Sequence, residues 1–166
     1  LSGSSILYSM NFNDLVEKHI QSSADITAVY TRDLNGFPTV PMGVAILRFN
    51  DHNRLYDMTI NMEDMSQHGI TWSTEVFVIR KSLLESLVAD AIAYGRYDFF
   101  EDILKRSVNN LNIQGYEYKG HLLEFSSVAG YMQANMNFLN REFRRKAFKR
   151  PIYTKSKDSV PARYYE

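Results

Sequence analysis

The apolar run Val76-Phe77-Val78-Ile79 is the feature of this sequence that most constrains its fold. A strand with apolar side chains on both faces needs cover on both, which is typical of a central strand in a sheet flanked by helices. We therefore expect a central, buried strand over 75–79. A helix is expected next, over 82–92, with Ser82 as its N-cap. Its apolar residues recur at helical spacing: Leu83, Leu84, Leu87, Val88, Ala91 and Ile92.

The first 31 residues predict a strand, a helix and a second strand. The segment 6–8 is apolar, and 25–30 is rich in β-branched residues. Between them, a helix with Asn11 or Asn13 as its cap is indicated. Its expected inner face carries Phe12, Leu15, Val16 and Ile20. This order predicts a βαβ unit with parallel strands.

The rest of the chain continues the alternation of strands and helices. The strands 43–49 and 54–60 flank a polar turn, so they predict an antiparallel hairpin. Loops are expected at 33–42, which holds Gly36, Pro38 and Pro41, and at 61–71. Further strands are predicted at 113–118 and 121–125, and helices at 98–108, 127–139 (capped by Ser127) and 141–149. The predicted fold class is α/β: a mostly parallel mixed sheet with flanking helices.

Composition and charge narrow the class of protein. The chain has no cysteine, which excludes disulfides and thiolate metal sites and fits a reducing, cytoplasmic location. No run of about 18 apolar residues is present, so no membrane helix is expected. Charge is uneven: residues 1–140 hold 10 basic and 16 acidic side chains, whereas 141–166 hold nine and three. A basic tail of this kind suits a phosphorylated ligand or an acidic partner, or is a solvated linker.

The sequence lacks the common signatures of phosphate and metal chemistry. It contains no Gly-rich phosphate loop. Its four histidines are dispersed, and no two stand at i and i+4, so no metal site is predicted. The basic tail has no recognisable nucleic-acid reader motif and few interleaved aromatic residues, so no nucleic-acid partner is expected.

The order of the segments and three motifs carry a resemblance to a known family. The motifs are Ala24-Asp25-Ile26-Thr27, the helix with Tyr131 followed by Ala134-Asn135, and Arg150-Pro151-Ile152-Tyr153-Thr154. The chain resembles the second half of the sugar-phosphate nucleotidyltransferases, specifically the bacterial glucose-1-phosphate adenylyltransferases of glycogen synthesis. The resemblance covers essentially the whole chain.

This resemblance implies a domain organisation. Residues 1–140 would be the C-terminal part of a nucleotidyltransferase-like, Rossmann-like domain. Residues 141–166 would be a basic linker towards a left-handed β-helix domain. We accordingly expect the chain to begin inside a domain. In the family the linker lies near subunit contacts and near the site for phosphorylated effectors, which suggests either role for Arg144, Arg145, Lys149 and Arg150.

The metal-holding motifs of the family are altered here. Catalytic members read Ser-Gly-Asp-His, and their Asp helps to hold magnesium; in this chain Ser4 stands in its place. A second metal-holding Asp lies in a Trp-Arg-Asp-Val-Gly-Thr motif, and Glu124 stands there instead. Magnesium demands near-ideal octahedral geometry and relies on one or two carboxylates. We therefore expect no metal bound by this chain and no intact catalytic site.

The sugar-phosphate pocket of the family is altered as well. Catalytic members hold the sugar phosphate with the Lys of a Glu-Lys-Pro segment, but residues 57–71 contain no Lys, Arg or Pro. The Ser-Met-Gly of the glucose pocket corresponds to Ser73, Thr74 and Glu75. A carboxylate in place of that Gly would crowd glucose and repel its phosphate. These residues therefore represent a degenerate substrate pocket.

Three interpretations follow from the sequence. The departures match the non-catalytic companion subunit of some Gram-positive bacteria, which pairs with a catalytic homologue in a hetero-oligomer, expected to be a tetramer. The second interpretation is an active nucleotidyltransferase in which Glu124 and another residue bind metal. The third is an unrelated α/β domain with a nucleic-acid-binding tail. We favour the regulatory or structural subunit, with self-association as the alternative mode of assembly.

Overall fold

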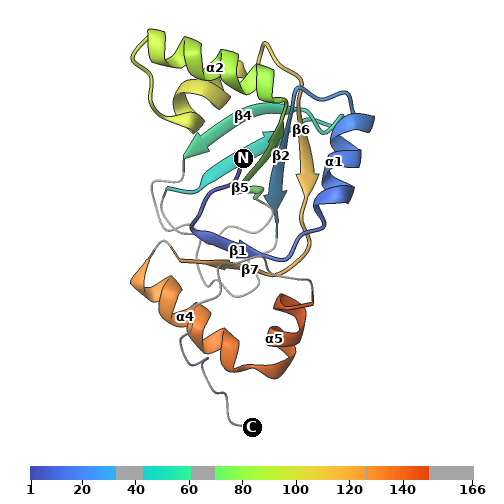
Figure 1. The fold of residues 1–166 in the computed structure, drawn as a ribbon, viewed down its shortest axis with the longest axis vertical. Coiled ribbons are helices and arrows are strands. Elements are labelled where there is room, and N and C mark those ends of the chain that lie inside the picture. Colours follow the sequence, from blue (N-terminus) through green and yellow to red (C-terminus); the bar gives the residue numbers. More distant parts are fainter. Residues whose placement is uncertain (33–42, 61–69, 126, 150–166) are drawn as a thin grey trace.

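The computed structural model describes residues 1–32, 43–60, 70–125 and 127–149 of the 166-residue chain. Its larger sheet has the strand order β4-β3-β5-β2-β6. A smaller sheet pairs β1 with β7 below it (Figure 1). The strands are β1 (Ile6–Tyr8), β2 (Ile26–Thr31), β3 (Ala45–Phe49), β4 (Leu55–Ile60), β5 (Trp72–Ile79), β6 (Ile113–Glu117) and β7 (Leu122–Glu124).

The α/β class and the mixed sheet are confirmed, but parallel pairs do not dominate. Only β2 and β6 run parallel among the described strands of the larger sheet; β2–β5, β3–β5 and β3–β4 are antiparallel. The predicted hairpin 43–60 is confirmed as β3 and β4. The predicted central strand is confirmed as β5, third of the five in order. The prediction of a βαβ unit is wrong, because β1 pairs antiparallel with β7 instead of pairing with β2. Both edges of β2 are already hydrogen-bonded, to β5 and β6.

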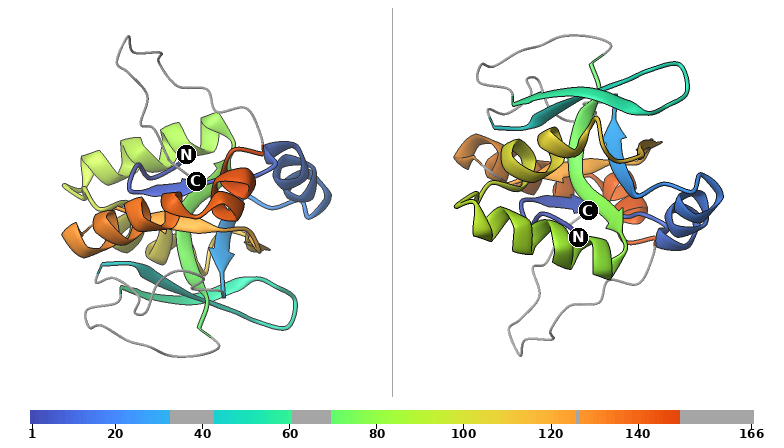
Figure 2. Two further views of the ribbon diagram at one scale, coloured as in Figure 1. Left: turned by 90° about the horizontal axis from the view of Figure 1, so that it is seen from below. Right: turned by 90° about the horizontal axis from the view of Figure 1, so that it is seen from above.

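Helices cover both faces of the sheet (Figures 1 and 2). Asn11 caps α1, and Ser127 caps α4 by accepting a hydrogen bond from the Gly130 N–H at 2.9 Å, so both predicted caps are confirmed. Ser82 is not a cap: α2 begins at Lys81, with Arg80 before it. The helices are α1 (Phe12–Gln21), α2 (Lys81–Ala93), the π-helix η1 (Phe99–Leu104), α3 (Lys105–Ser107), α4 (Val128–Leu139) and α5 (Arg141–Ala147).

Two apolar clusters sandwich the sheet. On one face, Ile26 and Phe77 pack with Leu104 and with side chains of α2. On the other, Val29 and Val76 pack with Leu15 of α1 and with residues of β1 and β7. Consecutive side chains of β5, Val76 and Phe77, thus enter opposite clusters, as predicted for a strand covered on both faces. Each fully buried large side chain contributes roughly 1.5–3 kcal/mol.

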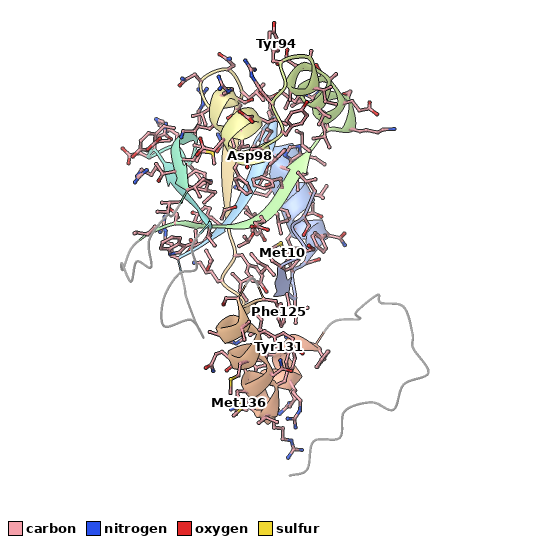
Figure 3. The ribbon with its side chains drawn as sticks, turned by 90° about the vertical axis from the view of Figure 1, so that its left-hand side faces the viewer. Met10, Tyr94, Asp98, Phe125, Tyr131 and Met136 are labelled. Atoms are coloured by element: carbon pink, nitrogen blue, oxygen red, sulfur yellow. The ribbon has the colours of Figure 1, made fainter. Side chains whose placement is uncertain are left out.

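The buried faces of the helices include fewer residues than the apolar spacing predicted. In α1, Leu15 and His19 are buried, whereas Phe12, Val16 and Ile20 are exposed. In α2, Val88 and Ile92 are exposed as well. The outward side of α4 is apolar and exposed. Its exposed residues are Val128, Tyr131, Met132, Met136 and Leu139; Figure 3 shows Tyr131 and Met136 on this helix.

Candidate functional site

Three segments far apart in sequence meet at the junction of the two sheets. Residues 1–3 run antiparallel along β5: the Ser2–Val76 bridge lies between the hydrogen bonds that join Leu1 to Phe77 and Gly3 to Glu75. Immediately afterwards, the Ser5 carbonyl accepts a 2.8 Å hydrogen bond from the Phe125 N–H, and Ile6 pairs with Glu124. The fold therefore brings the Ser4, Glu75 and Glu124 segments together, as expected if all three belong to one family site.

Glu75 has an unusual backbone for a residue with a side chain. Its φ is 57°, in the left-handed region that favours glycine, and it interrupts the regular register between β5 and β2. Left-handed backbone costs an L-residue roughly 1–2 kcal/mol. Glu75 thus has a glycine-like backbone while carrying a carboxylate, at the position for which the sequence analysis expects a glycine in the family. The backbone N–H of Glu75 donates to the Ser73 Oγ at 3.1 Å, which supports the turn.

The Glu75 carboxylate lies over the N-terminal segment. A β-carbon added at Gly3 would clash with Oε2 of Glu75 and would lie 2.9 Å from its Cβ. The Ser5 hydroxyl donates to the same Oε2 at 3.4 Å. Gly3 therefore permits the close approach, and the half-buried carboxylate fills the space beside the Ser-Gly-Ser segment. Gly3 and Ser5 were not singled out from the sequence; only their position beside Ser4 pointed to them.

Ser73 and Thr74 face the interior. They are 2% and 1% exposed, and the Thr74 hydroxyl donates to the Val29 carbonyl at 3.0 Å. The Thr74 hydroxyl thus joins β5 to β2, whereas the Ser73 Oγ supports the turn of β5 at Glu75. Of the three predicted pocket residues, Glu75 is thus the one that lies at the surface junction.

The described side chains at this junction do not fit magnesium. Ser4 supplies a neutral hydroxyl, and the Glu75 carboxylate is held against Gly3 and Ser5. Within the described ranges, no group of three or more His, Asp or Glu side chains is arranged to hold a metal. Only the backbone of Glu124 belongs to the described part, so its carboxylate is not placed. No catalytic step is assigned to a metal here.

The basic residues fall into different surroundings. Arg144 is turned back onto α4, where its Nη1 donates to the Phe138 and Leu139 carbonyls at 2.8 and 2.9 Å. Such bonds satisfy orphan carbonyls at a helix C-terminus. Arg145 and Lys149 are exposed, and Arg150 lies outside the described residues. Lys149 borders a groove beside α5.

Comparison with known proteins indicates the same family as the sequence analysis. No protein-family model matches the chain. It is similar to the glycogen biosynthesis protein GlgD of Bacillus subtilis (strain 168), with 29% identity over 94 residues, 55% of this chain and 27% of that protein. It is also similar to the chloroplastic/amyloplastic glucose-1-phosphate adenylyltransferase large subunit 1 of Zea mays, with 23% identity over 146 residues, 78% of this chain and 28% of that protein.

The chain spans a little over a quarter of the length of these relatives. Their similarity confirms the resemblance to the glucose-1-phosphate adenylyltransferase family. No helix in the described ranges is long and apolar enough to cross a membrane.

Proposed function

We propose that this chain is part of a non-catalytic, regulatory or structural subunit of a glucose-1-phosphate adenylyltransferase in glycogen biosynthesis. In this family ATP and glucose 1-phosphate are converted to ADP-glucose and diphosphate. The subunit would act in the cytoplasm. It would form a hetero-oligomer, a tetramer, with a catalytic homologue. Similarity to GlgD and to an adenylyltransferase large subunit supports the choice of pathway.

The observation that carries the non-catalytic assignment is the position of Glu75. Its carboxylate occupies the space beside Gly3, and the resemblance to the family assigns this position to the glucose pocket. A carboxylate there repels a phosphate, and residues 57–71 supply no cation to offset it. Transition-state charge stabilisation is the largest single contribution in many enzymes, so its loss reduces the rate by roughly a thousandfold or more.

The two clusters that sandwich the sheet preserve the shape of the domain, which is what a subunit contact requires. A subunit that packs against its neighbour can shift that neighbour's conformational equilibrium by about 1–3 kcal/mol, which changes the neighbour's ligand affinity roughly 5- to 150-fold. We assign Arg145, Lys149 and Arg150 to contact with the catalytic subunit or with a phosphorylated effector. Arg144 is the least suited of the four, because its guanidinium already binds the end of α4.

The test is an adenylyl-transfer assay of the complete gene product, alone and mixed with its catalytic homologue at fixed concentration. We expect little or no ADP-glucose from this subunit alone, and higher turnover of the homologue after mixing. Robust turnover by the subunit alone would support the active-enzyme interpretation. Mixing without any change in turnover and without co-elution would overturn the regulatory proposal.

A further inference from the structure

A groove lies between α5 and the segment that leads from β1 into α1. Its volume is about 730 Å³, within the 300–1,000 Å³ typical of small-molecule sites. Residues of the turn between β6 and β7 line it as well. Figure 1 shows α5 below the β1–β7 sheet, and Figure 3 shows Met10, one of the lining residues, between the larger sheet and the lower helices.

Aromatic rings form two walls of the groove. Tyr8 and Phe12 stack edge to face on one side, with ring centroids 6.1 Å apart. His121 and Phe143 form a tilted pair on the other, at 5.8 Å. Phe12 is half exposed although it belongs to the first turn of α1. Flat aromatic ligands gain from such surroundings, because ring pairs contribute about 0.5–1.5 kcal/mol beyond the area that they bury.

The charge of the groove has one sign. Lys146 and Lys149 stand on its rim, and no Asp or Glu is among the described residues that line it. Neither lysine enters an ion pair within the part of the chain that the structure describes. Asp14, Glu117 and Glu142 are each adjacent in sequence to a lining residue, but none of them lines the groove. Asp14 accepts a 2.6 Å hydrogen bond from Asn11, and Glu142 stands one helical turn before Lys146 in α5. An anionic group at the rim therefore meets two cations and no lining carboxylate.

We propose that this groove binds a small organic anion in which an aromatic ring carries a single phosphate or carboxylate group. The ring enters between the Tyr8–Phe12 and His121–Phe143 walls, and the anionic group faces Lys146 and Lys149. This site is separate from the junction at Glu75. The proposal does not depend on catalysis or on a partner subunit, since binding is measured on the chain itself.

The test titrates the 166-residue chain, labelled with ¹⁵N, with 1-naphthyl phosphate. Parallel titrations use 1-naphthol, which lacks the anion, and inorganic phosphate, which lacks the ring; 1-naphthoate distinguishes a carboxylate from a phosphate head group. We expect 1-naphthyl phosphate or 1-naphthoate to bind at least 5-fold more tightly than either half. The shifted amide signals should be those of the groove, including Gly120, His121 and Phe143.

Substitutions locate the anion. The double change Lys146→Gln and Lys149→Gln should weaken binding of the charged probes by roughly 5-fold, the effect of two exposed ion pairs, and leave 1-naphthol unchanged. Arg145→Gln is the matched control: it removes a cation from the same helix outside the groove and should change affinity less than about 2-fold. Charged probes that bind no better than 1-naphthol, lysine variants that bind like the original chain, or shifts confined to α4 would each overturn the proposal.

Discussion

Gly3 and Glu75 contact each other through both backbone and side chain. The Gly3 N–H donates to the Glu75 carbonyl at 3.0 Å, and the Glu75 carboxylate lies so close that a β-carbon at Gly3 would clash with it. Gly3 has no side chain, and this leaves room for the side chain of Glu75. The pair ties the N-terminal segment to β5 and closes the junction where the family motifs meet.

This contact predicts a coupled effect on stability. Gly3→Ala should lower the free energy of unfolding by about 1–3 kcal/mol, because the new methyl group overlaps the Glu75 side chain. In the Glu75→Gly background the same change should cost less, with a coupling energy of about 1 kcal/mol. Urea unfolding of the original chain, the two single variants and the double variant gives the double-mutant cycle. Additive effects would show that the Glu75 side chain turns away from Gly3 in solution.

The Ser4 position predicts weak magnesium binding. A calorimetric titration of the chain with magnesium should show no tight site, because Ser4 supplies no charge where the family has a carboxylate. Ser4→Asp should strengthen the interaction measurably, and Ser4→Asn, of similar size but neutral, should not. Tight binding by the original chain that is lost in Glu124→Ala would contradict the prediction and favour the active-enzyme interpretation.

Substitutions of Arg144 and of its neighbour Arg145 should differ in their effect on the stability of the protein. Arg144→Gln removes two hydrogen bonds to carbonyls at the end of α4 and should cost about 1–2 kcal/mol. Arg145→Gln changes an exposed side chain and should stay within about 0.5 kcal/mol. Thermal unfolding followed by circular dichroism compares the two. Equal effects would mean that Arg144 does not cap α4 in solution.

His19 should make stability fall in mild acid. Its Nδ1 lies 2.8 Å from the buried Thr27 hydroxyl, and burial, followed by the charge of Arg80, lowers the pKa of the imidazole. A base with a lowered folded-state pKa favours its neutral form, so its contribution is complete above the ordinary value of 6.5 and is lost as pH falls below it.

The measurement for His19 is the free energy of unfolding between pH 7.5 and 5. The original chain should lose stability on acidification by at most about 1.4 kcal/mol per pH unit from this group. His19→Gln keeps polar capacity without titrating, so its pH slope should be smaller. Identical slopes in the two chains would assign the acid sensitivity to other groups.

Local signals predicted much of the secondary structure. The polar turn 50–53 specified the hairpin of β3 and β4, and Asn11 and Ser127 marked the starts of α1 and α4. Ser82 misled because the helix-capping signal is weak and the apolar periodicity begins close to it; α2 starts at Lys81 without a side-chain cap. The predicted loops at 33–42 and most of 61–71, and the stretch after Lys149, lie outside the described residues.

Strand partners were less predictable, because pairing joins residues that are distant in sequence. The segment 6–8 has the local character of a strand, and it forms one, but its partner is β7, more than 110 residues away. Periodicity specifies which faces of a strand are buried, but not which edge is free to accept a neighbour. Since β5 and β6 occupy both edges of β2, the parallel β1–β2 pair had no place.

The sequence alone determined the α/β class and the central strand β5, because each depends on residue type and local spacing. For the same reason it was enough to predict that family carboxylate, lysine and glycine positions are replaced. Only the tertiary structure decided that Glu75 keeps a glycine-like φ of 57° and that its carboxylate meets Gly3. It alone brought His121 and Phe143 together beside Lys146 of α5 and Lys149. Those contacts join segments that are far apart in the chain, and no local preference encodes the distance between them.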